Sequence, residues 1–287
     1  MEKRNLGTTG HMISIITFGG IMVEDYDAEK ADRLVSFAIE NGVNYFDSAP
    51  SYGNSQYALG PALEPYRKDV ILACKTGKRD AEGAKAELLE SLKAHKTDYF
   101  DVYQLHGVSD LEEIEQIYAP GGAMETFHWA LKEGLTRHIG FTSHFDGIAL
   151  QLLENSELQT MLFPVNFALR EKKNLSVGPL EHWARSEGGA VAINSLLERK
   201  WREGEEEIFH CWYRPIFEDR KLATAALNYT LTRKGVATAV PPGDERVFRL
   251  AVEIIKEQGG AAREPNAEEA AYLMEFAEKL GESDFLF

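Results

Sequence analysis

The sequence predicts a (β/α)8 TIM barrel, formed as a single domain over residues 1–287, with an N-terminal cap segment and an extra C-terminal helix. Short apolar segments typical of strands alternate with amphipathic helical segments, a pattern that indicates a parallel sheet. Eight such strand segments can be counted, which favours a closed barrel over an open, doubly wound sheet. The open sheet also lacks support because the chain contains neither GxGxxG nor GxxxxGK(S/T).

The elements follow one another in order, with apolar residues repeating at helical spacing in each expected helix. After an opening segment that contains Gly7 and Gly10, the expected strands cover residues 13–18, 43–46, 70–73, 100–105, 139–141, 161–165, 190–193 and 236–240. The expected helices place their inward residues within 31–39, 84–92, 123–131, 149–153, 180–184, 222–229 and 247–255, and the tail helix within 270–277. Asp146 is expected to cap the helix that follows it, and Pro179 suits a first helical turn.

The composition indicates a globular protein without nucleic-acid or membrane partners. Hydrophobic residues make up 44% of the chain and charged residues 27%, and the formal net charge is −15. Nucleic-acid binding needs clustered Lys and Arg, which this acidic balance disfavours. No apolar run follows Lys3 and Arg4 as in a signal peptide, and no stretch approaches the ~18 apolar residues of a membrane span. We therefore expect a cytoplasmic protein.

The two cysteines, Cys74 and Cys211, stand in neither a CxxC nor a zinc-site spacing. Disulfide frameworks, structural zinc and iron–sulfur clusters therefore lose support. Cys74 follows the apolar run 70–73, where a buried and unreactive thiol is expected.

One segment, residues 195–219, breaks the alternation of strands and helices. It contains an acidic run at 203–207 and an aromatic cluster at 208–213. Loops of this length in compact domains are usually functional or disordered. Two interpretations stay open: a lid over a substrate, or a solvated surface insertion with a packed aromatic anchor.

Four polar residues follow three successive expected strands. Asp47 and Tyr52 follow the strand 43–46, Lys75 follows the next, and His106 follows the one after it. The carboxyl ends of barrel strands are where such enzymes hold their catalytic groups. Taken singly, an Asp–Lys pair is more often structural and a lone histidine more often a supporting group. Their position at consecutive strand ends carries the prediction of an active site.

These residue types form a coherent proton-transfer unit. A free tyrosine has a pKa of roughly 10, too high for rapid proton transfer near neutrality. A neighbouring ammonium lowers that pKa by favouring the phenolate, and a carboxylate keeps the ammonium charged. Tyr52 is thus predicted as the general acid, tuned by Lys75, with Asp47 as the partner of Lys75. His106 is predicted to donate a hydrogen bond to a carbonyl oxygen.

The segments around these residues resemble the aldo/keto reductase family. The segments that carry the resemblance are 41–49 with Tyr52-Gly53, 73–75, 98–106, and 133–134 with 137–144. The resemblance implies a (β/α)8 barrel that binds NADP(H), less often NAD(H), and transfers hydride from nicotinamide C4 to a carbonyl that Tyr52 protonates. The chain is most similar to a bacterial branch whose longer members carry a C-terminal iron–sulfur module, which two cysteines cannot form.

The resemblance also assigns cofactor-binding residues. Ser143 and His144 would hold the nicotinamide carboxamide, and Asn166 falls at a matching asparagine of the family. Leu162 stands where the family has a glutamine, and Asn194-Ser195-Leu196 replaces its usual cofactor-binding segment after strand seven. At the adenine end the resemblance implies contacts from Gly243, Arg246 and Arg249. The two arginines favour NADP(H) over NAD(H), although Asp244 and Glu245 add negative charge beside them.

The expected activity is that of an NAD(P)H-dependent carbonyl reductase or alcohol dehydrogenase (EC 1.1.1.-) acting on a small aldehyde, ketone or sugar-like substrate. The expected pocket walls are loop aromatics, namely Tyr26, Tyr118, Trp201, Trp212 and Phe217. A monomer or small homo-oligomer is expected. Two alternatives stay open: a non-enzymatic cofactor-binding sensor or partner subunit of the same family, and a metal-dependent barrel hydrolase using Asp47, His106 and His144 as ligands.

Overall fold

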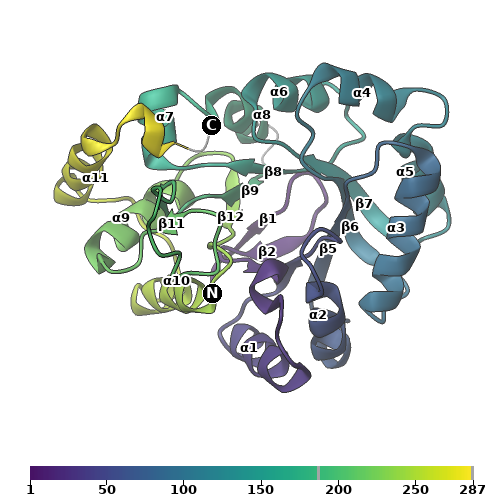
Figure 1. Ribbon diagram of the computed structural model, residues 1–287, viewed down its shortest axis with the longest axis horizontal. Coiled ribbons are helices and arrows are strands. Elements are labelled where there is room, and N and C mark those ends of the chain that lie inside the picture. The colour runs from purple at the N-terminus through teal and green to yellow at the C-terminus, as the bar shows by residue number, and fades with distance from the viewer. Residues whose placement is uncertain (186–187, 286–287) are drawn as a thin grey trace.

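The computed structural model describes residues 1–185 and 188–285 and has parallel strands at its centre with helices around them (Figure 1). The barrel strands are β3 (Phe18–Gly19), β4 (Tyr45–Asp47), β5 (Ile71–Thr76), β6 (Phe100–Leu105), β7 (Thr136–Thr142), β8 (Thr160–Pro164), β9 (Ala190–Ile193) and β12 (Val236–Ala239). Their order is β12-β9-β8-β7-β6-β5-β4-β3, and every neighbouring pair is parallel. A parallel bridge between Ile16 and Ala239 joins the two ends of the sheet. The predicted (β/α)8 barrel is confirmed.

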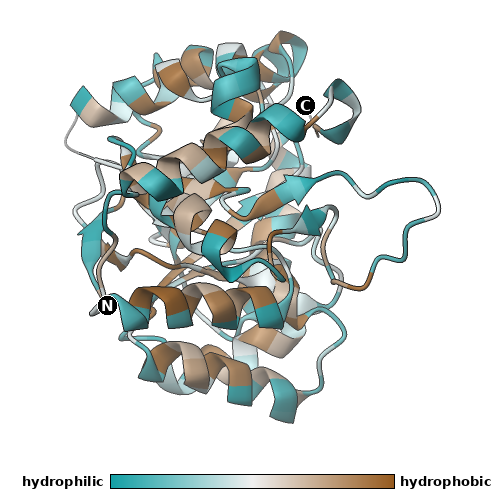
Figure 2. Ribbon diagram, turned by 90° about the vertical axis from the view of Figure 1, so that its left-hand side faces the viewer, coloured by the Kyte–Doolittle hydropathy of each residue, from teal (hydrophilic) through white to brown (hydrophobic). Residues whose placement is uncertain are grey.

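The helices lie outside the barrel, and Figure 2 shows hydrophobic residues beside hydrophilic ones along them. Those expected from the sequence are α1 (Ala28–Glu40), α3 (Ala81–Ala94), α5 (Ala123–Lys132), α6 (Asp146–Leu153), α8 (Val177–Arg185), α9 (Arg220–Leu231), α10 (Glu245–Glu257) and α11 (Ala267–Lys279). The structure adds α2 (Ser55–Leu63), α4 (Leu111–Tyr118), α7 (Phe167–Lys173) and the 3-10 helices η1 (Gly20–Val23), η2 (Glu64–Tyr66) and η3 (Glu282–Asp284). Among the described residues, no helix has the length and apolar character that crossing a membrane requires.

The helix α2 escaped the sequence analysis because it lacks an apolar stripe. Almost all of its residues are buried, and it contains Pro61 in its interior. A helix buried on most sides shows no contrast between an inner and an outer face.

The expectation that Asp146 caps the helix α6 is wrong. Phe145 occupies the N-cap position of α6, and the Asp146 carboxylate instead accepts a hydrogen bond from the Ser176 amide at 2.8 Å.

The apolar run 13–18, expected as one strand, is divided between two elements. Its first part belongs to β2 (Met12–Ser14), which pairs antiparallel with β1 (Lys3–Asn5), and its last residue begins β3. The hairpin places Leu6 and Ile13 in the apolar cluster inside the barrel. The Gly7 amide donates to the Gly189 carbonyl at 2.9 Å, just before β9. The hairpin therefore closes the N-terminal end of the barrel. It is the N-terminal cap segment that the sequence predicts.

Gly7 is required for this closure, and we expect Gly7→Ala to destabilise the fold. Gly7 has a φ of +49°, and a Cβ built on it would lie 1.8 Å from the Gln159 carbonyl oxygen. The contact is with backbone, so the hairpin must shift, at a cost of about 1–3 kcal/mol beyond the strain of the positive φ. Gly10→Ala is the matched control, because Gly10 has a φ of +77° with nothing within 4 Å. Urea unfolding would contradict the account if both variants lost equal stability.

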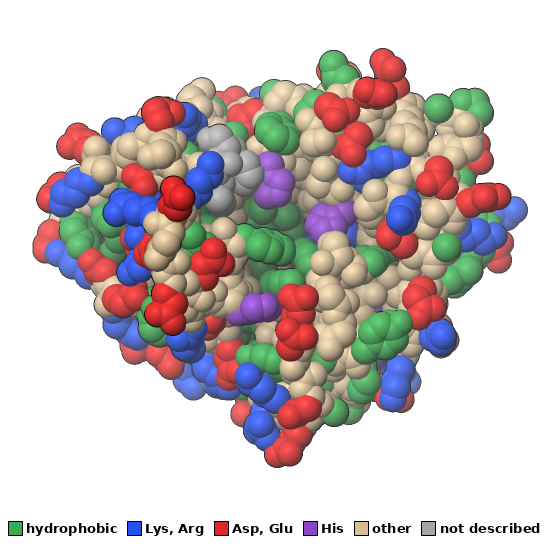
Figure 3. All heavy atoms as spheres, in the orientation of Figure 1, with side chains coloured by type: hydrophobic (Ala, Val, Ile, Leu, Met, Phe, Trp, Pro, Cys, Tyr) green, Lys and Arg blue, Asp and Glu red, His purple; other side chains and the backbone are tan. Residues whose placement is uncertain are grey.

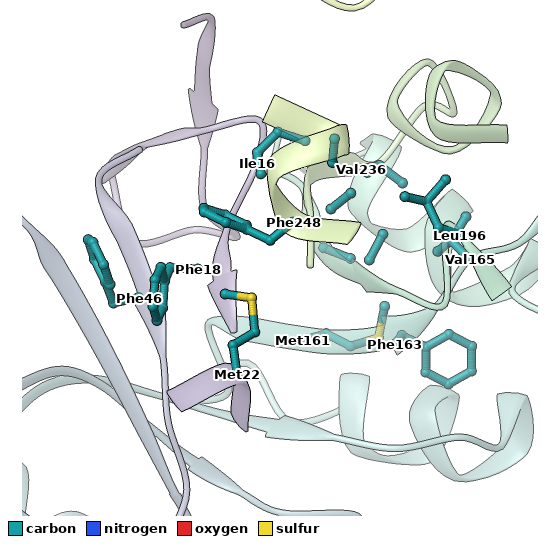
Figure 4. Packing of buried hydrophobic residues seen from close by; sticks show 14 of the residues in the cluster. Ile16, Phe18, Met22, Phe46, Met161, Phe163, Val165, Leu196, Val236 and Phe248 are labelled. Carbon is teal, nitrogen blue, oxygen red and sulfur yellow. The ribbon is translucent and has the colours of Figure 1, made fainter. Parts of the chain in front are cut away.

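Two apolar layers surround the strands. The inner layer fills the barrel with residues from alternate strand positions, among them Tyr45, Ala73 and Val102. The outer layer packs strands against helices: Phe18 lies 5.0 Å from Phe46 and 5.4 Å from Phe248 between ring centroids (Figure 4). This alternation determines which residues at the strand ends point into the barrel.

The tail helix α11 covers one side of the barrel. It packs against α7 and α9, which lie beside it in Figure 1. Its N-terminus carries a capping box between Asn266 and Glu269, and the ring of Phe276 lies 6.2 Å from that of Phe167. The expected extra C-terminal helix is confirmed.

Candidate active site

The four residues predicted from strand ends meet at the C-terminal mouth of the barrel. Successive side chains of a strand alternate between its two faces. Asp47 lies two positions beyond the inward Tyr45 of β4, and Lys75 two positions beyond the inward Ala73 of β5. His106 directly follows β6. The alternation therefore aims Asp47 and Lys75 into the barrel from neighbouring strands.

A buried ion pair holds the centre of this group. Lys75 is completely buried, and its Nζ lies 2.5 Å from Asp47 Oδ2 and donates to the Ser48 carbonyl at 2.9 Å. The same ammonium lies 3.4 Å from the Tyr52 hydroxyl oxygen. The Tyr52 amide donates to the Ala49 carbonyl at 3.2 Å, so a tight turn after β4 returns the phenol over the ammonium.

Burial and charge set the protonation states of this pair and of the phenol. Withdrawal from water opposes the charge of Lys75, but the Asp47 carboxylate outweighs it, and the pKa of Lys75 lies above its ordinary value. Burial raises the pKa of Tyr52, and the Lys75 ammonium lowers it only in part. The expectation of a net lowering of that pKa is corrected. Tyr52 stays protonated at neutral pH, as a proton donor must, while Lys75 makes the phenolate less costly.

His106 is neutral and faces Tyr52. The two rings are 5.8 Å apart between centroids and perpendicular to one another. Burial, followed by the charges of Lys75 and Arg79, lowers the pKa of His106 to about 3. The Arg79 guanidinium also donates to the His106 carbonyl at 2.9 Å, which fixes the backbone below the ring. A neutral imidazole in this position can donate one hydrogen bond into the mouth of the barrel.

The lowered pKa of His106 predicts a dependence of stability on pH. The unfolded chain protonates this residue below pH 6.5, whereas the folded chain resists protonation down to about 3. The neutral form thus contributes stability that is complete above pH 6.5 and is lost as the pH falls toward 3. This loss of stability can reach about 1.4 kcal/mol per pH unit, and His106→Gln should abolish it, because glutamine does not titrate. Urea unfolding across this range tests it, with the exposed His128→Gln as control; parallel curves for wild type and His106→Gln would contradict it.

A cavity of about 720 Å³ opens above these residues, within the size range of small-molecule sites. Its floor includes Asp47, Tyr52 and His106, and its walls come from the strand ends, from η1 and the residue after it, from residues 207–213 and from residues 240–243. Figure 3 shows this hollow at the centre of one face, with hydrophobic side chains inside and histidine and acidic side chains around it. The mouth of the barrel therefore holds a cavity large enough for a small molecule.

The residues expected to bind cofactor fall into two groups. His144, Asn194 and Gly243 line the cavity. The remaining residues, Ser143, Asn166, Ser195, Leu196, Arg246 and Arg249, are not among its lining residues. The Ser143 hydroxyl donates to the Val108 carbonyl at 2.8 Å.

Asn166 holds the turn that contains Asn194, and together they shape one wall of the cavity. The Asn166 amide nitrogen donates to the carbonyls of Asn194 at 3.0 Å and Leu197 at 3.1 Å, and its oxygen caps α7. Asn194 adopts a left-handed φ of 64° and is only 4% exposed. Its Nδ2 has no hydrogen-bond partner among the described residues, although it lies at the cavity wall. Asn166 thus positions the turn, and Asn194 presents an unsatisfied donor.

Of the five aromatics expected to form pocket walls, Trp212 alone lines the cavity. It is 73% exposed, and its ring lies 6.4 Å from that of Tyr52. The other four are engaged elsewhere: Tyr26 donates to Glu245, Tyr118 accepts from Asn155, Trp201 donates to the Cys211 carbonyl, and Phe217 packs on Phe209. Loop aromatics thus serve here mainly to anchor the loops.

The insertion 195–219 contributes a wall to the cavity and also carries exposed acidic residues, and its role as a lid stays a prediction. Its strands β10 (Leu197–Arg199) and β11 (Arg214–Pro215) form a hairpin, and residues 207–213 form a wall of the cavity. The His210 amide donates to Asp244 at 3.0 Å and Arg246 donates to the Ile208 carbonyl at 2.6 Å, which fix that wall to the start of α10. Glu203 and Glu206 remain exposed.

Other cavity residues were missed by the sequence analysis. They include Glu24, Thr142 and Pro241, each in a loop or at a strand end on the same side of the barrel. The glycine pair Gly19-Gly20, at the end of β3, and the double proline after β12 were available signals that the backbone turns there. The metal-site alternative loses its ligand set, because Asp47 is paired with Lys75 and no group of three potential ligands occurs within residues 1–185 and 188–285.

Comparisons with known proteins agree with this geometry. The model of the aldo/keto reductase family matches residues 15–168, more than half of the chain. YqkF of Bacillus subtilis, an uncharacterized oxidoreductase, is 28% identical over 94% of each chain. L-galactose dehydrogenase of Arabidopsis thaliana is 26% identical over 84% of this chain and 83% of its own. The solved structure of the aldo-keto reductase AKR11C1 from Bacillus halodurans, in its holo form, has a TM-score of 0.72 at 25% identity over 96% of each chain. The chain therefore belongs to the aldo/keto reductase family, whose members are NAD(P)H-dependent oxidoreductases.

Proposed function

We propose that the protein transfers a hydride between a nicotinamide dinucleotide and a carbonyl or alcohol substrate, with Tyr52 as the general acid and base. The observation that carries the proposal is the Lys75 ammonium, fixed by Asp47 at 2.5 Å and placed 3.4 Å from the Tyr52 hydroxyl inside the cavity. A buried lysine held charged beside a phenol is suited to moving a proton.

The cavity has features that fit a dinucleotide. It extends from Tyr52 to the loop before α10, and the Asn194 Nδ2 offers a buried donor that would suit an amide oxygen such as that of nicotinamide. His144 lies at the wall formed by the end of β7. The bound dinucleotide would supply the hydride, and the protein residues would orient the substrate and deliver the proton.

Each residue then has a distinct task. Tyr52 holds a proton on its hydroxyl oxygen and delivers it to the carbonyl oxygen as that atom gains negative charge. Lys75 stabilises the phenolate that remains, and Asp47 keeps the ammonium oriented. His106, neutral because of its lowered pKa, donates a hydrogen bond to the same carbonyl oxygen. The apolar walls exclude water from the reacting atoms.

The substrate proposed is a small aldehyde or ketone, with sugar-like carbonyl compounds included. Polar groups at the cavity wall, among them Glu24, His210 and the Trp212 indole, could receive or donate hydrogen bonds to hydroxyl groups. The similarity to a protein named L-galactose dehydrogenase supports the inclusion of sugar-like substrates.

Isotope transfer tests the proposed function. A reduced dinucleotide with deuterium in both C4 positions of the nicotinamide ring is incubated with the protein and a panel of aldehydes, and the alcohol product is examined by mass spectrometry. Deuterium in the carbon skeleton of the alcohol is the expected result. Binding of the dinucleotide without transfer to any aldehyde of the panel would instead favour the sensor or partner-subunit alternative.

A further inference from the structure

The two nicotinamide dinucleotides differ by one phosphate on the adenine ribose, and the charges of the cavity discriminate between them. We infer that this protein selects NAD(H), because the charged groups at the start of α10 neutralise one another, while Glu24 and Glu207 add negative charge to the cavity wall. The inference rests on the proposed function and concerns the end of the cavity opposite to Tyr52.

The position of that end follows from the barrel. The reacting ring of a dinucleotide must lie beside Tyr52, so its remainder extends toward residues 207–213 and 240–243. Phosphates in TIM barrels commonly bind at the loops after the seventh and eighth strands, beside a helix N-terminus. Here these loops follow β9 and β12, and the helix is α10.

The start of α10 already holds an internal anion. Asp244 is the N-cap, and its carboxylate accepts from the Arg246 amide at 2.9 Å and from the His210 amide at 3.0 Å. The Arg246 side chain adds bonds of 2.9 Å and 2.7 Å to the same carboxylate. An added phosphate would meet an N-terminus whose partial positive charge is already satisfied.

Both arginines expected to bind a 2′-phosphate are likewise committed. Arg246 is bound to Asp244 and to the Ile208 carbonyl, and its guanidinium lies 4.4 Å from the centre of the Phe209 ring. Arg249 pairs with Glu245 at 2.8 Å and lies 4.1 Å from the centre of the Phe37 ring. A phosphate at either guanidinium would therefore lie beside a carboxylate that already neutralises the positive charge.

The remaining charges add to this preference. Among the described residues that line the cavity none is Lys or Arg, whereas Glu24 and Glu207 both line it. Glu245 binds Arg249 and the Tyr26 hydroxyl, and its side chain is 25% exposed, so it can still accept from a ribose hydroxyl. The sequence-based preference for NADP(H) is thereby reversed, because the sequence does not show that each guanidinium is already bound by a carboxylate.

Direct binding tests the inference. Quenching of protein fluorescence, to which Trp212 in the cavity contributes, is titrated with NADH and with NADPH. We expect NADH to bind at least about tenfold more tightly, since like charges placed together disfavour NADPH. The variant Asp244→Asn/Glu245→Gln retains a capping side chain and removes the carboxylates that neutralise both arginines, and should shift the ratio of NADH to NADPH affinity about tenfold toward NADPH.

The matched control is Glu253→Gln/Glu257→Gln, which makes the same change of net charge on α10, where both carboxylates pair with Arg220. The control should leave the NADH to NADPH ratio unchanged, and thermal unfolding checks that each variant is folded. Equal or tighter binding of NADPH by wild type would overturn the inference while leaving the proposed function intact. An unchanged ratio in Asp244→Asn/Glu245→Gln would overturn the assignment of these carboxylates. Binding of neither dinucleotide would overturn the proposed function itself, and the inference with it.

Discussion

Tyr52→Phe is expected to lower the rate of carbonyl reduction by about 10²–10⁴-fold while dinucleotide affinity changes little. The variant removes only the hydroxyl group, which lies 3.4 Å from Lys75 Nζ and carries the proton that the product oxygen needs. The phenyl ring still packs against His106, so the shape of the cavity is preserved. A single-turnover measurement with a reduced dinucleotide and an aldehyde gives the rate, and a fluorescence titration gives the affinity.

Tyr57→Phe is the control for that experiment. Tyr57 is an exposed tyrosine of α2 whose hydroxyl donates to Glu90 at 2.6 Å, outside the cavity. The control should retain the wild-type rate. A Tyr52→Phe enzyme that reduces aldehydes at the wild-type rate would show that another group provides the proton.

Lys75→Met is expected to have the largest effect on stability, in addition to a loss of activity. The substitution leaves the Asp47 carboxylate buried without its partner, and breaking one side of a buried ion pair costs about 3–5 kcal/mol. The rate of reduction should also fall, because the Tyr52 phenolate loses its nearest positive charge. Urea unfolding measures the first effect and single-turnover kinetics the second.

A double variant separates these two effects. In Lys75→Met/Asp47→Leu the unpaired charge is gone, and apolar replacements of buried ion pairs are often neutral or stabilising. We expect most of the stability to return while the rate stays low. If activity returned together with stability, the pair would have only a structural role.

Much of the site could be predicted because it depends on strand periodicity. Asp47 lies an even number of residues beyond Tyr45, and Lys75 beyond Ala73, so alternation alone aims them inward. The parallel order of the strands then brings the ends of β4, β5 and β6 side by side. The alternation within a strand is a local property that the sequence shows directly, and the repeated succession of strands and helices predicts the parallel order.

The partners of individual side chains could not be predicted, since they depend on contacts between distant segments. Asn166 was expected at the cofactor, but its amide is occupied by carbonyls of the turn after β9. Arg246 was expected to bind a phosphate, but an insertion carbonyl 38 positions away and the adjoining Asp244 bind it instead. Tyr26 was expected in a pocket wall and is held by Glu245. In each case the residue type was informative and its hydrogen-bond partner was not visible in the sequence.

The solvent isotope effect on single-turnover reduction tests the central claim, proton delivery by Tyr52, most directly. The account predicts that wild type reduces an aldehyde more slowly in D₂O than in H₂O, because the Tyr52 hydroxyl exchanges its proton with solvent and transfers it during the reaction. The residual reaction of Tyr52→Phe should lack this effect or show a different one. An equal isotope effect in the two proteins would contradict the assignment of Tyr52 as the proton donor.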